Sequence, residues 1–279
     1  MKDVDYLVRG LKRRSGLYKH RSSYPLISGD TYREMCQFKF DSAFDLVSID
    51  VLVGATGNVF VAAGIAEEFL SKLKRNENRY INLNLIIHNG DEIPSNSDLN
   101  YWSGEFKTIY SVNYLGNSRG IFPLPIGLEN WSYQQNGIPK YFRKVPNLVR
   151  DIKILISFND FTNPLERLQA RETTRSISGA RVLSSMELRE YREYLSRSKF
   201  VLSPPGNGAD CHRTWEAMYY GAVPIVKREF WPFQAINLPV LVVNDWNDIE
   251  EAIEDFPSDS NFIDWKNELL ALEKIRNLF

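Results

Sequence analysis

Residues 199–226 decide the fold, and they read KFVLSPPGNGADCHRTWEAMYYGAVPIV. The apolar run 200–203 predicts a buried strand, and a loop rich in Pro and Gly follows it. Residues 212–220 then show a helical pattern, which Gly221 ends, and 222–227 predict the next strand. This order of strand, glycine loop, helix and strand indicates an α/β fold with parallel sheet.

The same alternation of strand-like and helical patterns extends over the rest of the chain. Further strands are predicted at 46–53, 83–88, 109–112, 152–158 and 240–243. Further helices are predicted at 59–74, 163–174, 185–196, 246–253 and 263–278. The polar, proline-bearing stretch 123–147 has the composition of a connector. We therefore expect two Rossmann-like domains, 1–145 and 146–279, that face a central cleft, with the last helix able to pack back on the first domain.

Composition excludes several classes of protein. The formal net charge of −1 over 279 residues gives no global field to attract nucleic acid or an anionic membrane. No stretch approaches the roughly 20 apolar residues that span a bilayer, and the N-terminus lacks the apolar run of a secretory signal. Cys36 and Cys211 are far apart, which fits a reducing compartment better than a disulfide scaffold. We expect a soluble, cytoplasmic protein of open oligomeric state, without nucleic-acid partners or a membrane span.

The glycine loop and the following helix have the features of a phosphate site. Backbone N–H groups at a helix N-terminus favour an anion, and Arg213 in the first turn adds a cation with two donors. Glu216 shares the face of Arg213 and suits the two hydroxyls of a ribose. The alternative is structural, with Asp210 as N-cap and Arg213–Glu216 as a surface pair. The predicted nucleotide-sugar-binding residues are Ser157, Asn159, Arg167, Ser203, Pro205, Gly206, Asn207, Gly208, Arg213 and Glu216.

The segment 198–226 resembles the exostosin-type glycosyltransferases and their microbial relatives, which share a strand, a Pro/Gly loop, an Arg and a Glu on one helix, and G-x-x-P-[IV]-[IV]. LIIHNGDEIP (85–94), PLPIGLEN (123–130) and ILISFNDFTNPLERLQAR (154–171) are similar to other segments of that family. The resemblance implies a GT-B architecture with the nucleotide in the second domain. It also implies transfer with inversion, usually from a UDP-sugar to a sugar hydroxyl of a glycan acceptor.

An inverting transferase needs a base that takes the proton of the acceptor hydroxyl, and we expect it in the first half of the chain. His88 and Asp91 directly follow a predicted strand. Asp30 is the other candidate, although the sequence around it, Ser-Gly-Asp-Thr, is also ordinary turn chemistry. The aromatic segment 229–233 either walls the sugar pocket or plugs an apolar space.

Neither a metal nor a cofactor is expected. The three histidines show no paired spacing, and the only Asp-x-Asp, at Asp3 and Asp5, has no strand before it. Members of the family use UDP-xylose, UDP-galactose, UDP-glucuronate and UDP-N-acetylglucosamine, and nothing in this sequence selects one; xylose is the first guess. Two alternatives stay open, a non-catalytic module that binds sugar nucleotides or glycans, and a nucleotide-sugar epimerase.

Overall fold

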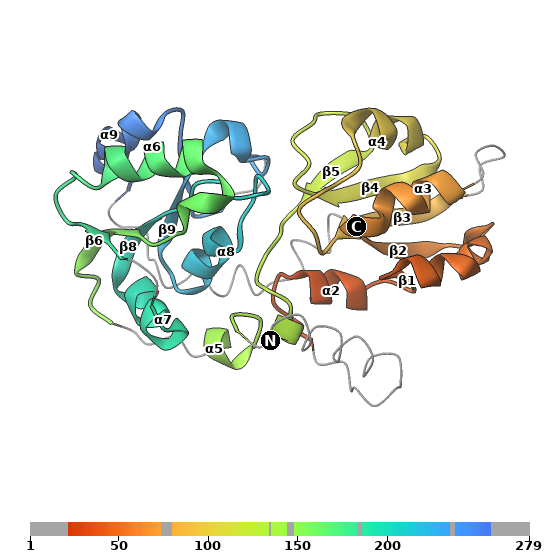
Figure 1. Cartoon of the computed structure of the whole chain (residues 1–279), viewed down its shortest axis with the longest axis horizontal. Coiled ribbons are helices and arrows are strands. Elements are labelled where there is room, and N and C mark those ends of the chain that lie inside the picture. Colours follow the sequence, from red (N-terminus) through yellow and green to blue (C-terminus); the bar gives the residue numbers. More distant parts are fainter. Residues whose placement is uncertain are drawn as a thin grey trace.

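The computed structural model describes residues 22–73, 80–133, 135–143, 148–183, 186–234 and 238–257. It contains two parallel sheets of five strands, each covered by helices, so the predicted α/β class is confirmed (Figure 1). Asp3 and Asp5, the histidine at position 20 and the helix predicted at 263–278 fall outside the described residues.

The N-terminal sheet has the strand order β1-β2-β3-β4-β5, and its faces follow from side-chain alternation. Val59 and Val61 of β2 pack with the helices α3 and α4, whereas Phe60 between them packs on the opposite face with Tyr32 of α2. The elements are α2 (Gly29–Glu34), β1 (Phe38–Phe40), β2 (Gly57–Ala62), α3 (Ala66–Lys72), β3 (Tyr80–His88), α4 (Asn96–Trp102), β4 (Phe106–Val112) and β5 (Ile121–Leu124).

The C-terminal sheet has the strand order β10-β9-β8-β6-β7. The chain goes from β6 outward to β7, then returns to the other side of β6 and continues through β8 to β10. The direction of winding therefore reverses between β6 and β8, and ligands of open α/β sheets bind outside the carboxyl ends of the strands at such a point. The elements are α5 (Lys140–Arg143), β6 (Ile152–Ile156), α6 (Pro164–Thr174), β7 (Ala180–Val182), α7 (Leu188–Arg197), β8 (Ser198–Leu202), α8 (His212–Tyr219), β9 (Val223–Lys227), β10 (Leu241–Val243) and α9 (Ile249–Glu254).

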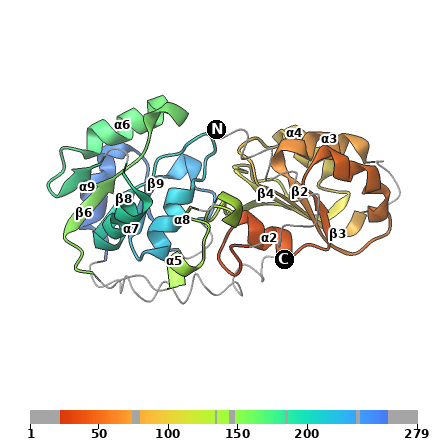
Figure 2. The same ribbon diagram turned by 60° about the horizontal axis from the view of Figure 1, so that its bottom comes forward.

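One apolar cluster is continuous across the two halves. It joins Leu26 and Tyr32 of the first half to Trp215 and Tyr219 of α8. The backbone N–H of Ile27 also donates to the Tyr219 hydroxyl at 2.9 Å. Figure 2 shows α8 and α2 on the sides of the two halves that face each other. The predicted boundary at 145/146 falls between the two sheets, in a stretch that the structure does not describe, and stays a prediction.

Two predicted elements are wrong. The stretch 46–53 is not a strand, because a 3-10 helix spans Ala43–Leu52 and begins with a capping box between Ser42 and Asp45. Its apolar residues do not alternate into a core, and the side chain of Val47 is 89% exposed. The helix predicted at 59–74 is instead the strand β2 followed by the short helix α3. A short apolar run such as the first half of this stretch fits a strand and a helix equally well.

Candidate active site

The reversal in the C-terminal sheet brings two predicted segments together. β6 and β8 are paired, with Ile154 opposite Phe200, so their carboxyl ends lie side by side. Ser157 and Asn159 follow β6, and the loop from Ser203 to Gly208 follows β8 and leads into α8. The predicted donor-binding residues of both segments therefore meet at one edge of the sheet.

Two arginines connect the two strand ends. Arg213 Nε, from the first turn of α8, donates to the Ser157 carbonyl at 3.1 Å. Arg167 Nε, from α6, donates to the Pro205 carbonyl at 2.8 Å, and its Nη1 donates to the Asn159 carbonyl. The guanidinium carbons of Arg213 and Arg167 lie 5.1 and 5.8 Å from the centre of the Phe158 ring. The pair thus lies around one aromatic ring at the predicted phosphate position.

No carboxylate neutralises this pair among the residues that the structure describes, since no acidic oxygen lies within 4.0 Å of either guanidinium. Arg171, the next arginine along α6, is different, because its Nη1 pairs with Asp160 at 2.6 Å. Arg167 is only 6% exposed, and burial, together with the nearby Arg213 cation, lowers its pKa. Two buried or half-buried cations without an acid are unfavourable alone and favour an added anion.

Gly206 leaves room for one of these cations. A Cβ on Gly206 would lie 2.8 Å from Arg167 Nη2, which is closer than real Cβ contacts. Glycine at this place therefore lets the loop approach the guanidinium directly. Gly208 faces the other half of the molecule, where a Cβ would meet the side chain of Asn113.

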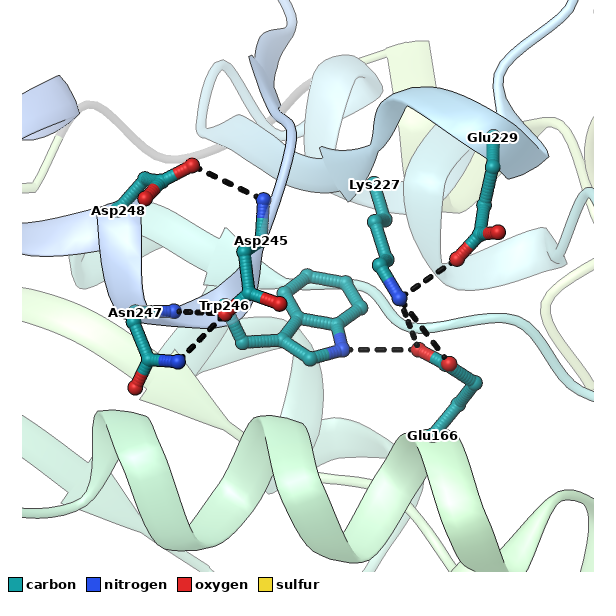
Figure 3. A network of polar contacts seen from close by, with 7 residues as sticks. All are labelled: Glu166, Lys227, Glu229, Asp245, Trp246, Asn247 and Asp248. Carbon is teal, nitrogen blue, oxygen red and sulfur yellow. Dashed lines mark hydrogen bonds and ion pairs between the residues drawn. The ribbon is translucent and has the colours of Figure 1, made fainter.

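A polar network holds the first turn of α6, as Figure 3 shows. The Glu166 carboxylate accepts from Trp246 Nε1 at 2.9 Å and pairs with Lys227 Nζ at 3.2 Å. Lys227 ends β9, and Trp246 follows β10, so the network ties α6 to two neighbouring strands. Because Arg167 is the next residue after Glu166, the network also holds the backbone from which the Arg167 side chain extends.

Glu216 is buried under the connector between the two sheets. The side chain is 5% exposed and accepts from Asn136 Nδ2 at 2.8 Å and from the Tyr191 hydroxyl at 3.0 Å. Burial raises its pKa, while these two donors oppose the rise. The alternative of a solvated Arg213–Glu216 surface pair is therefore wrong, because the carboxylate is buried and bonded elsewhere.

Asp210 has a role that the sequence did not reveal. The N-cap of α8 is Cys211, so the alternative of Asp210 as N-cap is wrong. Its buried carboxylate instead accepts from Trp215 Nε1 at 2.8 Å and from the backbone N–H of Ile126, in the other half, at 2.9 Å. Burial raises the pKa of Asp210 to about 6. No periodic pattern links Asp210 to Ile126, since they are distant in the sequence.

The three candidate bases lie in different surroundings. Asp30 is 3% exposed, and its carboxylate accepts from the backbone N–H groups of Ser23 and Trp131. His88 is 2% exposed, with Nε2 3.1 Å from the Pro125 carbonyl and Nδ1 accepting from the Asn89 backbone N–H at 2.7 Å. Burial lowers the pKa of His88 to about 4.

Asp91 is exposed and lines a cavity between the two halves. The cavity has a volume of about 570 Å³. Asp91 Oδ2 accepts from Asn207 Nδ2 of the glycine loop at 3.1 Å. The residues that line the cavity are Asp91, Glu92, Thr162, Asn163, Pro164, Gly206 and Asn207. Among the three candidates, Asp91 is the one that contacts the glycine loop.

The aromatic segment 229–233 has a structural role. Trp231 and Phe233 are buried against Trp215, which supports the alternative in which this segment fills an apolar space.

The opposite pKa shifts of His88 and Asp210 predict opposite effects of pH on stability. Burial disfavours the charged form of His88. Its contribution to stability is therefore complete above pH 6.5 and is lost as the pH falls toward 4. Burial disfavours the charged form of Asp210. Its contribution to stability is therefore complete below pH 3.8 and is lost as the pH rises toward 6. Each amounts to about 3 kcal/mol, and the two oppose each other between pH 4 and 6.

We therefore expect His88→Gln and Asp210→Asn to change the pH profile in opposite directions. Acidification from pH 6.5 to 4 should raise the free energy of unfolding of His88→Gln relative to the parent and lower that of Asp210→Asn. Urea denaturation at several pH values measures both differences. Variant profiles parallel to that of the parent would contradict the buried, neutral state of His88 and the protonation of Asp210 near pH 6.

Within the described ranges, no helix is long and apolar enough to cross a membrane. The same part of the chain contains no cluster of three or more His, Cys, Asp or Glu side chains arranged to hold a metal.

Fold and site together define an α/β protein in which two arginines without a carboxylate partner among the described residues lie at the winding reversal of the C-terminal sheet. The family model described as RXYLT1 C-terminal domain matches residues 168–261, about a third of the chain, including the glycine loop and α8. The match confirms the resemblance of this segment to the exostosin-like family.

Solved structures that match the chain include an alpha-glucosyltransferase in complex with UDP-glucose and DNA containing an abasic site. It is 10% identical at a TM-score of 0.38, over 84% of this chain and 83% of that one. A GtfA/B complex bound to UDP and GlcNAc is 8% identical at a TM-score of 0.31, over 78% of this chain and 52% of that chain. No curated protein matches the chain in sequence.

Proposed function

We propose that the protein is an inverting glycosyltransferase that moves a sugar from a UDP-sugar to a hydroxyl of a glycan acceptor. One observation supports this most: Arg167 and Arg213 lie together at the winding reversal without a carboxylate partner among the described residues. A diphosphate supplies the missing negative charge and accepts from both guanidinium groups. The family of the C-terminal domain supports the same chemistry.

The two arginines stabilise the leaving group of the reaction. As the bond between the anomeric carbon and the diphosphate oxygen breaks, its electron pair goes to the diphosphate, where charge develops. Cations fixed in advance stabilise that charge without reorganisation, which lowers the barrier. Because Arg167 and Arg213 meet the diphosphate charge, we propose that no metal is required.

Asp91 is the residue that we propose as the base. It lines the cavity next to the glycine loop, where it accepts from Asn207, and it is exposed. Asp30 and His88 are buried, and Asp30 Oδ2 and both ring nitrogens of His88 are bonded to the backbone. Its carboxylate takes the acceptor's proton as the acceptor oxygen bonds to the anomeric carbon on the face opposite the diphosphate. A single displacement of this kind inverts the anomeric centre.

The proposal is tested with a panel of sugar nucleotides, xylose being the first donor sugar to try. A bound donor at 100 times its Kd stabilises the fold by about 2.7 kcal/mol, which a thermal shift detects. We expect UDP and at least one UDP-sugar to raise the melting temperature, and GDP at the same concentration to raise it less. If no UDP compound does so, the proposal fails.

Turnover separates the proposed enzyme from the two alternatives. A transferase releases UDP faster when its acceptor is present. A binding module would be stabilised by UDP-sugars without consuming them. An epimerase would convert the donor sugar without any acceptor and without releasing UDP. Chromatography of the nucleotide products after incubation with a UDP-sugar and a mixture of glycans distinguishes the three outcomes.

A further inference from the structure

Glu216 is held by side chains from two other segments. Asn136, from the connector, donates to Oε1 at 2.8 Å, and Tyr191, from α7, donates to Oε2 at 3.0 Å. Asn136 is itself 5% exposed, so its side chain is buried against the carboxylate. Each oxygen of Glu216 thus has one fixed donor from a different part of the chain.

The orientation of the Asn136 amide is also fixed. Arg192 Nε donates to Asn136 Oδ1 at 3.0 Å, so the amide NH₂ group has to face Glu216. The backbone N–H of Asn136 donates to Glu129 Oε2 at 3.0 Å, which closes the loop of the connector between these two residues. Arg192 in turn lies 3.8 Å above the ring of Tyr141. These contacts therefore hold Asn136 of the connector in the position from which it donates to Glu216.

The two donors leave hydrogen-bonding sites of the Glu216 carboxylate open to a ligand. Each oxygen of an ionised carboxylate has two lone-pair sites, and Asn136 and Tyr191 occupy one on each. One site on each oxygen remains, which matches two neighbouring hydroxyl donors such as those of a ribose. Arg213 precedes Glu216 by one helical turn, so a nucleoside diphosphate reaches both when its ribose follows its phosphates.

We infer that Asn136 and Tyr191 are positioning residues that set the protein's selectivity for a ribonucleotide, because they hold the Glu216 carboxylate in place for the ribose hydroxyls. The inference rests on the proposed function and on the expectation from the sequence that Glu216 accepts from the ribose hydroxyls. Arg192 contributes indirectly, since it fixes the amide of Asn136 in the donating orientation.

Titration calorimetry with UDP and 2′-deoxy-UDP tests this inference. We expect the parent to bind UDP at least tenfold more tightly than 2′-deoxy-UDP, because the lost hydroxyl leaves a charged acceptor unpaired. Asn136→Ala and Tyr191→Phe should each reduce this ratio to within a few fold, mainly by weakening UDP. Arg192→Met should reduce it partly. A general loss of stability would weaken both nucleotides alike and leave the ratio unchanged.

Tyr194→Phe is the matched control, since it removes the same hydroxyl one turn further along α7, where Tyr194 contacts Arg181 and Arg197 instead. It should keep the parental ratio. Tyr191→Phe keeps its ring, so it serves as the test even if Asn136→Ala does not fold. An unchanged ratio in a folded Tyr191→Phe, tighter UDP binding by Asn136→Ala, or a parent that binds both nucleotides equally would overturn the inference. A parent that binds no UDP would instead overturn the proposed function.

Discussion

Arg213→Ala is expected to weaken UDP binding and to lower turnover by about two to three orders of magnitude. The guanidinium lies half-buried at the carboxyl end of β6, and within the described part of the chain its polar partners are the Ser157 carbonyl and the Cys211 sulfur. Its charge is therefore available to a diphosphate, and that charge matters most when the leaving group departs. Calorimetry with UDP and initial rates with the best donor measure the two effects.

Arg171→Ala is the matched control for this substitution. Arg171 lies over the same Phe158 ring at 5.1 Å, but Asp160 already neutralises it. We expect its loss to change UDP affinity only slightly. Arg167→Ala, in contrast, should resemble Arg213→Ala, because Arg167 has no carboxylate partner in the described part of the chain. UDP binding by Arg213→Ala that equals the parent would contradict the placement of the diphosphate at α8.

Asp91→Asn is expected to lower transfer by about two to four orders of magnitude while UDP affinity stays unchanged. The amide cannot take a proton from the acceptor, but its oxygen can still accept from Asn207, so the cavity should keep its shape. Initial rates of transfer, with UDP affinity measured on the same preparation, test both halves of the expectation. Glu92→Gln, the neighbouring residue in the same cavity wall, is the control and should retain transfer.

Asp30→Asn tells the candidate bases apart. Asp30 accepts from two backbone N–H groups and from the Ser23 hydroxyl, so an amide in its place should lower the stability of the fold. Its effect on transfer per folded molecule should be small. If folded Asp30→Asn loses transfer while Asp91→Asn retains it, the base is Asp30 and the cavity wall has another role.

The sequence predicted the C-terminal sheet better than the N-terminal one, and the reason is local. The strands β6, β8, β9 and β10 are apolar runs bounded by polar or glycine turns, and all four were predicted. Four strands escaped prediction: β1, β5 and β7, which lie at sheet edges and have three or four residues each, and the internal strand β2, whose apolar run was predicted as part of a helix. The short edge strands β1, β5 and β7 show too few alternations for a periodic signal, whereas the equally short edge strand β10 was predicted because its residues form a continuous apolar run.

The site was predictable where its residues follow one another along the chain. The glycine loop, Arg213 and Glu216 could be placed because a strand, a loop and a helix position them in sequence. Asn136 is different, since 80 residues separate it from Glu216 and only the path of the connector brings them together. The hydrogen bond between Asp210 and Ile126 was missed for the same reason, because it joins loops of the two halves that are 84 positions apart in the sequence.

The apolar cluster shared by the two halves has a consequence for how the protein unfolds. Trp215 and Tyr219 are buried on α8 partly by the first half of the chain, where Leu26 and Tyr32 belong to the same cluster. Excising the second half would expose these aromatic surfaces to water, so neither half retains its full core alone. Unfolding of the two halves is therefore thermodynamically coupled. Calorimetry should record one cooperative transition, and a destabilising substitution in either sheet should lower the temperature of that single transition.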